Sequence, residues 1–302
     1  MENSLIKTIR ILKVPKVILR YIMMNFLDLP TIKNLLLTVK EMNVLDNHSK
    51  DFLKKANKGF KYSCKNGHLA VAQWIYSADD GDIHDYDVDD YDADAYDNEY
   101  AFKHSCKNGH LAVAQWVYSL GRVDIHADNE YAFRHSCKNG HLAVAKWLYS
   151  IGGVDIHAHN EHAFRCSCKN DHLAVAQWIY SLGDVDIHAN DEYAFRRSCE
   201  NVHPAVAQWI YSLGDVDIHA HGEYAFRCSC VNGHLAIAQW IYSLGDVNIH
   251  AHDEYAFRWS CCDDHLVVAK WLYSLGIINT RTINECILRW SRGKVLEWLN
   301  SL

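Results

Sequence analysis

Apolar positions are grouped in blocks along most of this chain, and residues 129–158 show one block in full. Residues 142–150 are apolar on nearly every side, which is typical of a helix buried between neighbouring elements. The preceding residues, 131–137, predict a shorter first helix. Asn129 is a residue type that caps helices well, and Glu130 would follow in the first turn, where the helix dipole favours a carboxylate. The pattern therefore predicts two consecutive helices.

Glycines separate these elements. Gly140, in the sequence Asn-Gly-His, predicts a left-handed stop after the first helix. Gly152 and Gly153 end the second helix, and residues 154–158 predict an extended connection to the next block.

The glycine between the two helices is not kept in every block, because Asp171, Val202 and Asp264 replace it. Asp tolerates a positive φ, whereas the β-branched Val does so poorly. Pro204 follows at the start of a second helix, where proline is acceptable. We therefore predict a strained or reshaped turn at Val202.

The block recurs with a period of 31 residues. Three residue types keep this step: Cys106, Cys137, Cys168, Cys199, Cys230 and Cys261; His110, His141, His172, His203, His234 and His265; and Trp116, Trp147, Trp178, Trp209, Trp240 and Trp271. An earlier copy, with Cys64, lies 42 residues ahead of its successor. A period of about 20–50 residues marks an array in which each unit buries its apolar face only against its neighbours.

The period therefore predicts an all-α helical repeat solenoid over residues 56–302, with seven clear units and a partial eighth at the C-terminal end. A terminal unit of altered composition is what a capped array requires. Residues 78–98 form an acidic insert after the first unit, and residues 1–55 lie outside the period.

The repeat resembles a known family. Asn-Gly-His followed by an apolar helix and a Gly resembles the second half of an ankyrin repeat, and residues 154–158 resemble the stretch after it. Residues 131–134 stand where that family has Thr-Pro-Leu-His, so the hydrogen bonds of that tetrad are not implied. The period is shorter than the family's period of about 33 residues, which implies a helical solenoid with trimmed loop fingers. The pattern is also similar to the divergent ankyrin arrays of giant DNA viruses of amoebae.

The net charge of −7 comes from one segment. Residues 78–98 hold ten Asp and no Lys or Arg, and the rest of the chain has a balance of +3. The array is thus near neutral without a basic stripe, which argues against nucleic-acid binding. The insert does not fit the calcium-binding template that needs Gly and Glu at fixed places. We interpret it as a solvated loop, with weak binding of divalent ions or of a basic partner left open.

The eleven cysteines and twenty histidines are interpreted as structural. Equivalent cysteines of stacked helices lie about 8–10 Å apart, farther than a disulfide allows. The same spacing prevents repeated histidines from sharing one zinc ion, and no zinc-ligand motif occurs. We expect no metal and no cofactor, and histidines that bond loop backbone between units. The start of the sequence lacks a signal-peptide pattern and a stretch long enough to span a membrane, so we expect a reducing, cytoplasmic location, the host cytoplasm if the protein is viral.

The N-terminal residues leave two interpretations open. Residues 14–40 predict two or three short helices and loosely resemble an F-box, with Val14 in place of the opening Leu and no closing Cys. The segment would either cap the first unit or recruit a ubiquitin ligase.

We expect a non-catalytic, monomeric scaffold that binds a protein partner on the concave face of the array. The alternatives are a substrate receptor that links a target to a ubiquitin ligase, and a structural, virion-associated protein. Identical copies in every unit argue against a unique active centre, so we expect no enzyme. Candidate binding positions are those that differ between units. They are Asp128, His159, Asn190, His221 and His252 at the links; Lys107, Lys138, Lys169, Glu200, Val231 and Cys262 at the end of the first helix; and His104, His135, Cys166, Arg197, Cys228 and Trp259 within it.

Overall fold

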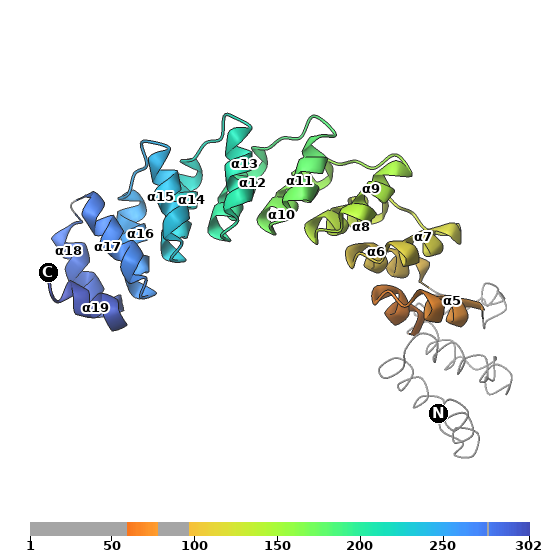
Figure 1. Cartoon of the computed structure of the whole chain (residues 1–302), viewed down its shortest axis with the longest axis horizontal. Helices are drawn as coiled ribbons and strands as arrows, with labels where there is room; N and C mark the ends of the chain where they lie inside the picture. Colours follow the sequence, from red (N-terminus) through yellow and green to blue (C-terminus); the bar gives the residue numbers. More distant parts are fainter. Residues whose placement is uncertain (1–58, 78–96, 277) are drawn as a thin grey trace, which may run out of the picture. The chain divides into compact units, whose positions relative to one another are not determined.

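The computed structural model describes residues 59–77, 97–276 and 278–302. In these ranges the chain is α-helical with one π-helical segment, η2 (Cys286–Trp290), and it contains no β-strand. The chain divides into two compact units, residues 1–124 and 125–302, which are described in turn (Figure 1). The predictions for residues 1–55 and for the acidic insert before Asp97 concern residues outside these ranges.

Unit 1 contains a helical segment at residues 59–65, then α5 (Leu69–Ser77), α6 (Asn98–Lys107) and α7 (Leu111–Ser119). Helix α6 packs against α7 and buries Phe102 and Cys106 completely. The backbone N–H of Tyr100 donates to Asp97 Oδ1 at 2.7 Å, so Asp97 caps α6. Asn98, the equivalent of Asn129 one period earlier, was expected to cap this helix, but it is the first residue of α6 and is buried.

Unit 2 contains five helix pairs and a shorter final group. The first helices are α8 (Ala127–Lys138), α10 (Ala158–Lys169), α12 (Ala189–Glu200), α14 (Ala220–Val231) and α16 (Ala251–Cys262). The second helices are α9 (Leu142–Ser150), α11 (Leu173–Tyr180), α13 (Pro204–Ser212), α15 (Leu235–Ser243) and α17 (Leu266–Leu275). The final group is α18 (Thr280–Glu285), η2 and α19 (Gly293–Leu299).

The pairs of unit 2 stack in two rows. Each first helix packs against its own second helix and against the first helix of the next pair. Within unit 2 the pairs follow an arc, and the row of first helices lies on its inner side (Figure 1). The prediction of a helical repeat is therefore confirmed, and the predicted second helix at residues 142–150 matches α9.

The core repeats with the sequence. Each first helix buries a Phe and each second helix an aliphatic residue, such as Phe133 and Leu148, both with no exposed surface. Burying one such side chain contributes about 1.5–3 kcal/mol. Between pairs, the ring of Tyr149 meets Trp178 edge-on at 5.9 Å, and the same contact recurs at the following junctions. The faithfully repeated apolar residues are therefore those that join neighbouring units.

The start of each first helix in unit 2 differs from the prediction. Asp128, Asn129 and Glu130 all adopt the left-handed conformation, with φ of 53°, 52° and 63°, so Asn129 is not a helix cap. Arg134 stabilises this turn, because its Nε donates to the carbonyl of Asn129 at 2.6 Å and its Nη2 to that of Asp128 at 2.9 Å. The same turn starts α10, α12, α14 and α16.

The glutamate of this turn joins neighbouring units. Glu130 is 5% exposed, and its Oε1 lies 2.7 Å from His126 Nδ1. The same oxygen accepts a hydrogen bond of 3.3 Å from the backbone N–H of Asp155 in the next link. Glu130 was predicted to lie in the first turn of a helix, where the dipole favours a carboxylate, but it is a buried acceptor that bonds the link to the next unit.

The turn at Val202 keeps the left-handed conformation of its glycine counterparts. Val202 has φ 64°, whereas Gly140 has φ 80°. The hydrogen bond that closes the turn, from His203 N to Ser198 O, is 2.9 Å long and matches that of the other units. The β-branched residue is thus held in a left-handed conformation that costs an L-residue about 1–2 kcal/mol, so of the two predicted outcomes the strained turn is the one observed.

Candidate protein-binding surface

The variable positions on the first helices of unit 2 form one continuous face, called here the first-helix surface. Equivalent residues lie side by side because consecutive first helices are in contact. The surface consists of His135, Lys138, Cys166, Lys169, Arg197, Glu200, Cys228, Val231, Trp259 and Cys262. Its residues are half-buried except Trp259, which is 44% exposed, and Cys166, which is buried. Because Cys166 is buried, the structure does not support its predicted role as a contact residue. The corresponding residues His104 and Lys107 lie on α6 in unit 1.

The link positions Asp128, His159, Asn190, His221 and His252 are all exposed and all left-handed. Their side chains reach the preceding unit: His159 Nε2 lies 3.2 Å from Asn129 Nδ2, and His221 Nε2 lies 3.1 Å from Asp191 Oδ2. Exposed contacts of this kind contribute little to the stability of the fold. The link residues therefore border the first-helix surface and remain accessible to a partner.

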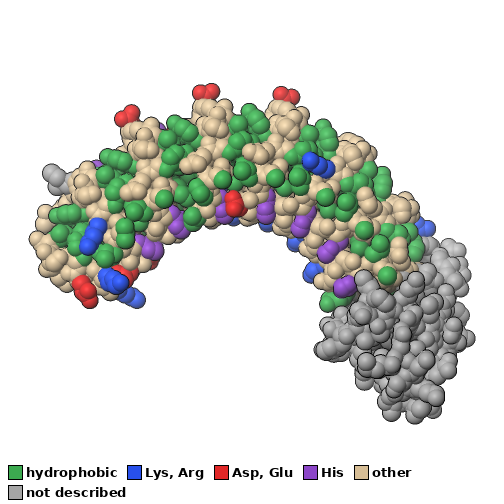
Figure 2. Space-filling view, in the orientation of Figure 1, with side chains coloured by type: hydrophobic (Ala, Val, Ile, Leu, Met, Phe, Trp, Pro, Cys, Tyr) green, Lys and Arg blue, Asp and Glu red, His purple; other side chains and the backbone are tan. Residues whose placement is uncertain are grey.

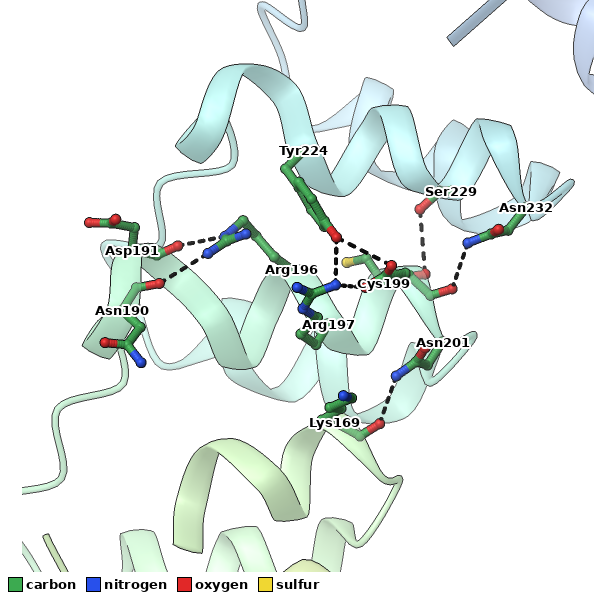
Figure 3. A network of polar contacts seen from close by, with 11 residues as sticks. Lys169, Asn190, Asp191, Arg196, Arg197, Cys199, Asn201, Tyr224, Ser229 and Asn232 are labelled. Carbon is green, nitrogen blue, oxygen red and sulfur yellow. Dashed lines mark hydrogen bonds and ion pairs between the residues drawn. The ribbon is translucent and has the colours of Figure 1, made fainter. Parts of the chain in front are cut away.

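Asparagines hold the ends of the first helices together. The Nδ2 of Asn170 donates to the carbonyl of Lys138 at 2.8 Å, and that of Asn201 to the carbonyl of Lys169 at 3.1 Å (Figure 3). These bonds use the backbone of the two lysines and leave their side chains outside them. A third bond, from Asn232 Nδ2 to the carbonyl of Glu200 at 3.3 Å, is of the same kind. The backbone positions of Lys138, Lys169 and Glu200 are therefore fixed, whereas their side-chain chemistry changes.

The basic end of the surface surrounds His162. Elsewhere in unit 2 this position is a tyrosine, for example Tyr131. Burial, together with the positive charges of Arg134 and other nearby basic groups, lowers the pKa of His162 to about 4, so the ring is neutral at pH 7. Its Nδ1 is buried and has no hydrogen-bond partner among the described residues. The sequence reasoning missed His162, although its departure from the tyrosine of other units was a readable signal.

Cys166 and His162 form the one close Cys–His contact among the described residues, with Sγ 3.5 Å from Nε2. Burial raises the pKa of the Cys166 thiol and outweighs the nearby positive charges. The thiol therefore keeps its proton while the imidazole stays neutral, and neither group is charged. This is the opposite of the thiolate–imidazolium state that activates a cysteine nucleophile.

The middle of the surface is occupied by residues that pair with each other. Arg197 Nη1 bonds both Glu200 Oε2 and the hydroxyl of Tyr224, and that hydroxyl donates to Glu200 Oε1 at 3.2 Å (Figure 3). The Arg197 guanidinium also lies over the rings of Tyr193 and Tyr224, at 5.3 and 5.2 Å. These charges therefore largely cancel.

The repeated histidines and cysteines have structural contacts. A Cβ atom on Gly140 would lie 2.6 Å from His172 Nδ1, so the ring of one unit covers the glycine of the unit before it. His172 and His234 also bond the backbone of Lys138 and Glu200 in the preceding units, as predicted. All eleven cysteines are free thiols. No group of three or more His, Cys, Asp or Glu in the described ranges could hold a metal ion.

Figure 2 shows histidine side chains gathered along the inner side of unit 2.

Within residues 59–77, 97–276 and 278–302, no helix combines the length and apolarity that crossing a membrane requires. Comparison with models of known protein families finds no match for this chain, and comparison with curated proteins finds none either.

Proposed function

We propose that this protein is a non-catalytic scaffold that binds a protein partner through the first-helix surface. The observation that carries the proposal is the contrast between two sets of positions. Residues that pack between units are the same in each repeat, for example Phe133 and Phe164, whereas the neighbouring surface positions differ in charge and size. Packing alone requires no such variation, so these positions are free to serve recognition.

The repeat itself is proposed to be a divergent ankyrin-like unit with shortened fingers. The two-helix unit, the left-handed Gly140 and the stacking of first helices on one side support this. The protonated thiol of Cys166 beside the neutral ring of His162 supports a non-catalytic role. A protein of the host cell is the proposed partner if the chain is viral.

The test compares capture by three full-length proteins from cytosolic extract. The surface variant carries Lys169→Glu and Trp259→Ser. The control variant carries Lys146→Glu and Val267→Ser, which make the same charge change and a similar apolar loss at exposed positions of the second-helix row. We expect the wild type and the control to retain the same partner, and the surface variant to lose it while its melting temperature stays unchanged. Equal capture by all three proteins would refute the proposal.

A further inference from the structure

The first-helix surface changes its chemistry in one direction along unit 2. At the α8 and α10 end, Lys138 and Lys169 are half-buried and take part in no ion pair among the described residues. Both lie near His162 or Cys166, together with the side chains of Arg134 and Arg165. The two lysines of this end therefore carry positive charge without a paired carboxylate among the described residues.

The charged groups at this end favour an anion. The Nδ1 of His162 lacks a partner, although a buried polar atom is normally satisfied. The rings of His135 and His162 lie 5.9 Å apart, and Lys138 is among the cations close to His162. A carboxylate placed over Lys138 and Lys169 would accept hydrogen bonds from their ammonium groups and offset their charge.

The opposite end is apolar. At α14 and α16 the same positions are Cys228, Val231, Trp259 and Cys262. Trp259 is 44% exposed, and its ring lies 5.9 Å from that of Tyr255. An exposed Trp beside half-buried apolar residues is the composition that marks the anchor of a protein interface. Between the two ends, Arg197 and Glu200 neutralise each other.

We propose that the partner presents one extended segment, with acidic side chains over Lys138 and Lys169 and a large apolar side chain over Val231 and Trp259. This inference rests on the proposed function and names its ligand. Lys169 and Trp259 are three helix steps apart, or about 24–30 Å at about 8–10 Å per step. An extended chain covers about 3.3 Å per residue, so the acidic and apolar side chains are about seven to nine residues apart.

The test is a selection of binders from a displayed library of random twelve-residue peptides, with the full-length protein as bait. We expect enriched sequences to carry Asp or Glu near one end and Trp, Phe or Leu about seven to nine residues away. The strongest peptide is then synthesised and its affinity is measured for the wild type and for three variants.

The variants separate the two ends. The variant with both Lys138→Glu and Lys169→Glu should bind the peptide about tenfold or more weakly. In a repeated selection it should lose the preference for acidic residues. Trp259→Ser should remove only the apolar preference. The matched control, Lys146→Glu with Val267→Ser on the second-helix row, should leave both preferences and the affinity unchanged. In addition, bound peptide should raise the pKa of His162 from about 4, as followed by the NMR shifts of its ring.

The outcomes distinguish this inference from the proposed function. Enriched peptides without the acidic–apolar spacing, or with both preferences intact in the variants, would overturn the inference while leaving a binding surface in place. A library that yields no binder also overturns it, and the capture experiment with Lys169→Glu and Trp259→Ser then decides whether the proposed function falls as well.

Discussion

The strained turn at Val202 gives the sharpest test of the physical account. Val202 adopts a left-handed conformation that costs an L-residue about 1–2 kcal/mol, at the upper end for a β-branched residue. Replacing Val202 by Gly removes this cost, because glycine adopts the same conformation without strain. Glycine gives back about 0.5–1 kcal/mol because it has more freedom in the unfolded chain. Val202 is 46% exposed, so little apolar burial is lost. We expect Val202→Gly to stabilise the protein by about 1 kcal/mol.

The reverse change at the equivalent position serves as the control. Gly140→Val introduces the same backbone cost and brings a side chain against His172, whose Nδ1 would be 2.6 Å from the new Cβ. Because overpacking alone costs about 1–3 kcal/mol, we expect a destabilisation of about 2–3 kcal/mol. The two substitutions should therefore have opposite signs.

Urea unfolding of the full chain measures both effects. With a slope of about 1–3 kcal/mol per molar urea, 1 kcal/mol moves the midpoint by roughly 0.3–1 M. Since an array need not unfold in one step, hydrogen exchange at the His203 amide, which donates to Ser198 O at 2.9 Å, reports the local effect. If Val202→Gly leaves this amide no better protected and the midpoint unchanged, the argument from left-handed strain is wrong.

Three further predictions concern single contacts of unit 2. Arg196→Lys should cost about 1–2 kcal/mol in urea unfolding, because an ammonium cannot span the carbonyls of Asp191 and Asn190 as the guanidinium does at 2.6 and 3.0 Å. Stability should fall as the pH drops from about 6.5 towards 4, because the unfolded chain binds the proton that folded His162 does not, and His162→Tyr should reduce this fall by on the order of 1 kcal/mol in urea unfolding at pH 4.5 and 7. Asp264→Ala should cost about 1 kcal/mol and speed hydrogen exchange at the Val295 amide, which donates to Asp264 Oδ1 at 2.9 Å, while amides of α8 exchange as before.

The sequence predicts the repeat and its second helix because these depend on local pattern. The left-handed stop at Gly140 follows from a single residue type, and α9 from a continuous apolar run. Both are properties of neighbouring residues, so no tertiary contact is needed to foresee them.

The left-handed turn before the first helix could not be predicted in the same way. It depends on Arg134, which bonds carbonyls five and six residues earlier, and on Glu130, which bonds the next unit. The residues involved, His126, Glu130 and Arg134, recur at a regular spacing in the sequence. Local capping preference nevertheless favours Asn129 as a helix cap, and it is overruled by the tertiary contacts.

The candidate surface was only partly predictable. Variation between units identified Lys138, Lys169 and Trp259, all of which lie on one face. It also identified Cys166, which is buried, and it overlooked His162. Variation shows where packing leaves freedom, but only the structure shows which of these side chains reach the solvent.

The bonds at each junction of unit 2 have a consequence for how such a chain can change in length. Glu161 bonds His157 at 2.7 Å and the backbone of Asp186 at 3.4 Å, and Glu192 makes the same two bonds one unit later. Excising residues 160–190 would place Glu192 four residues after His157 and restore this junction. The chain can thus gain or lose whole units of 31 residues while every junction keeps the same bonds. Each such step would shift the distance between its basic and apolar ends by one helix spacing.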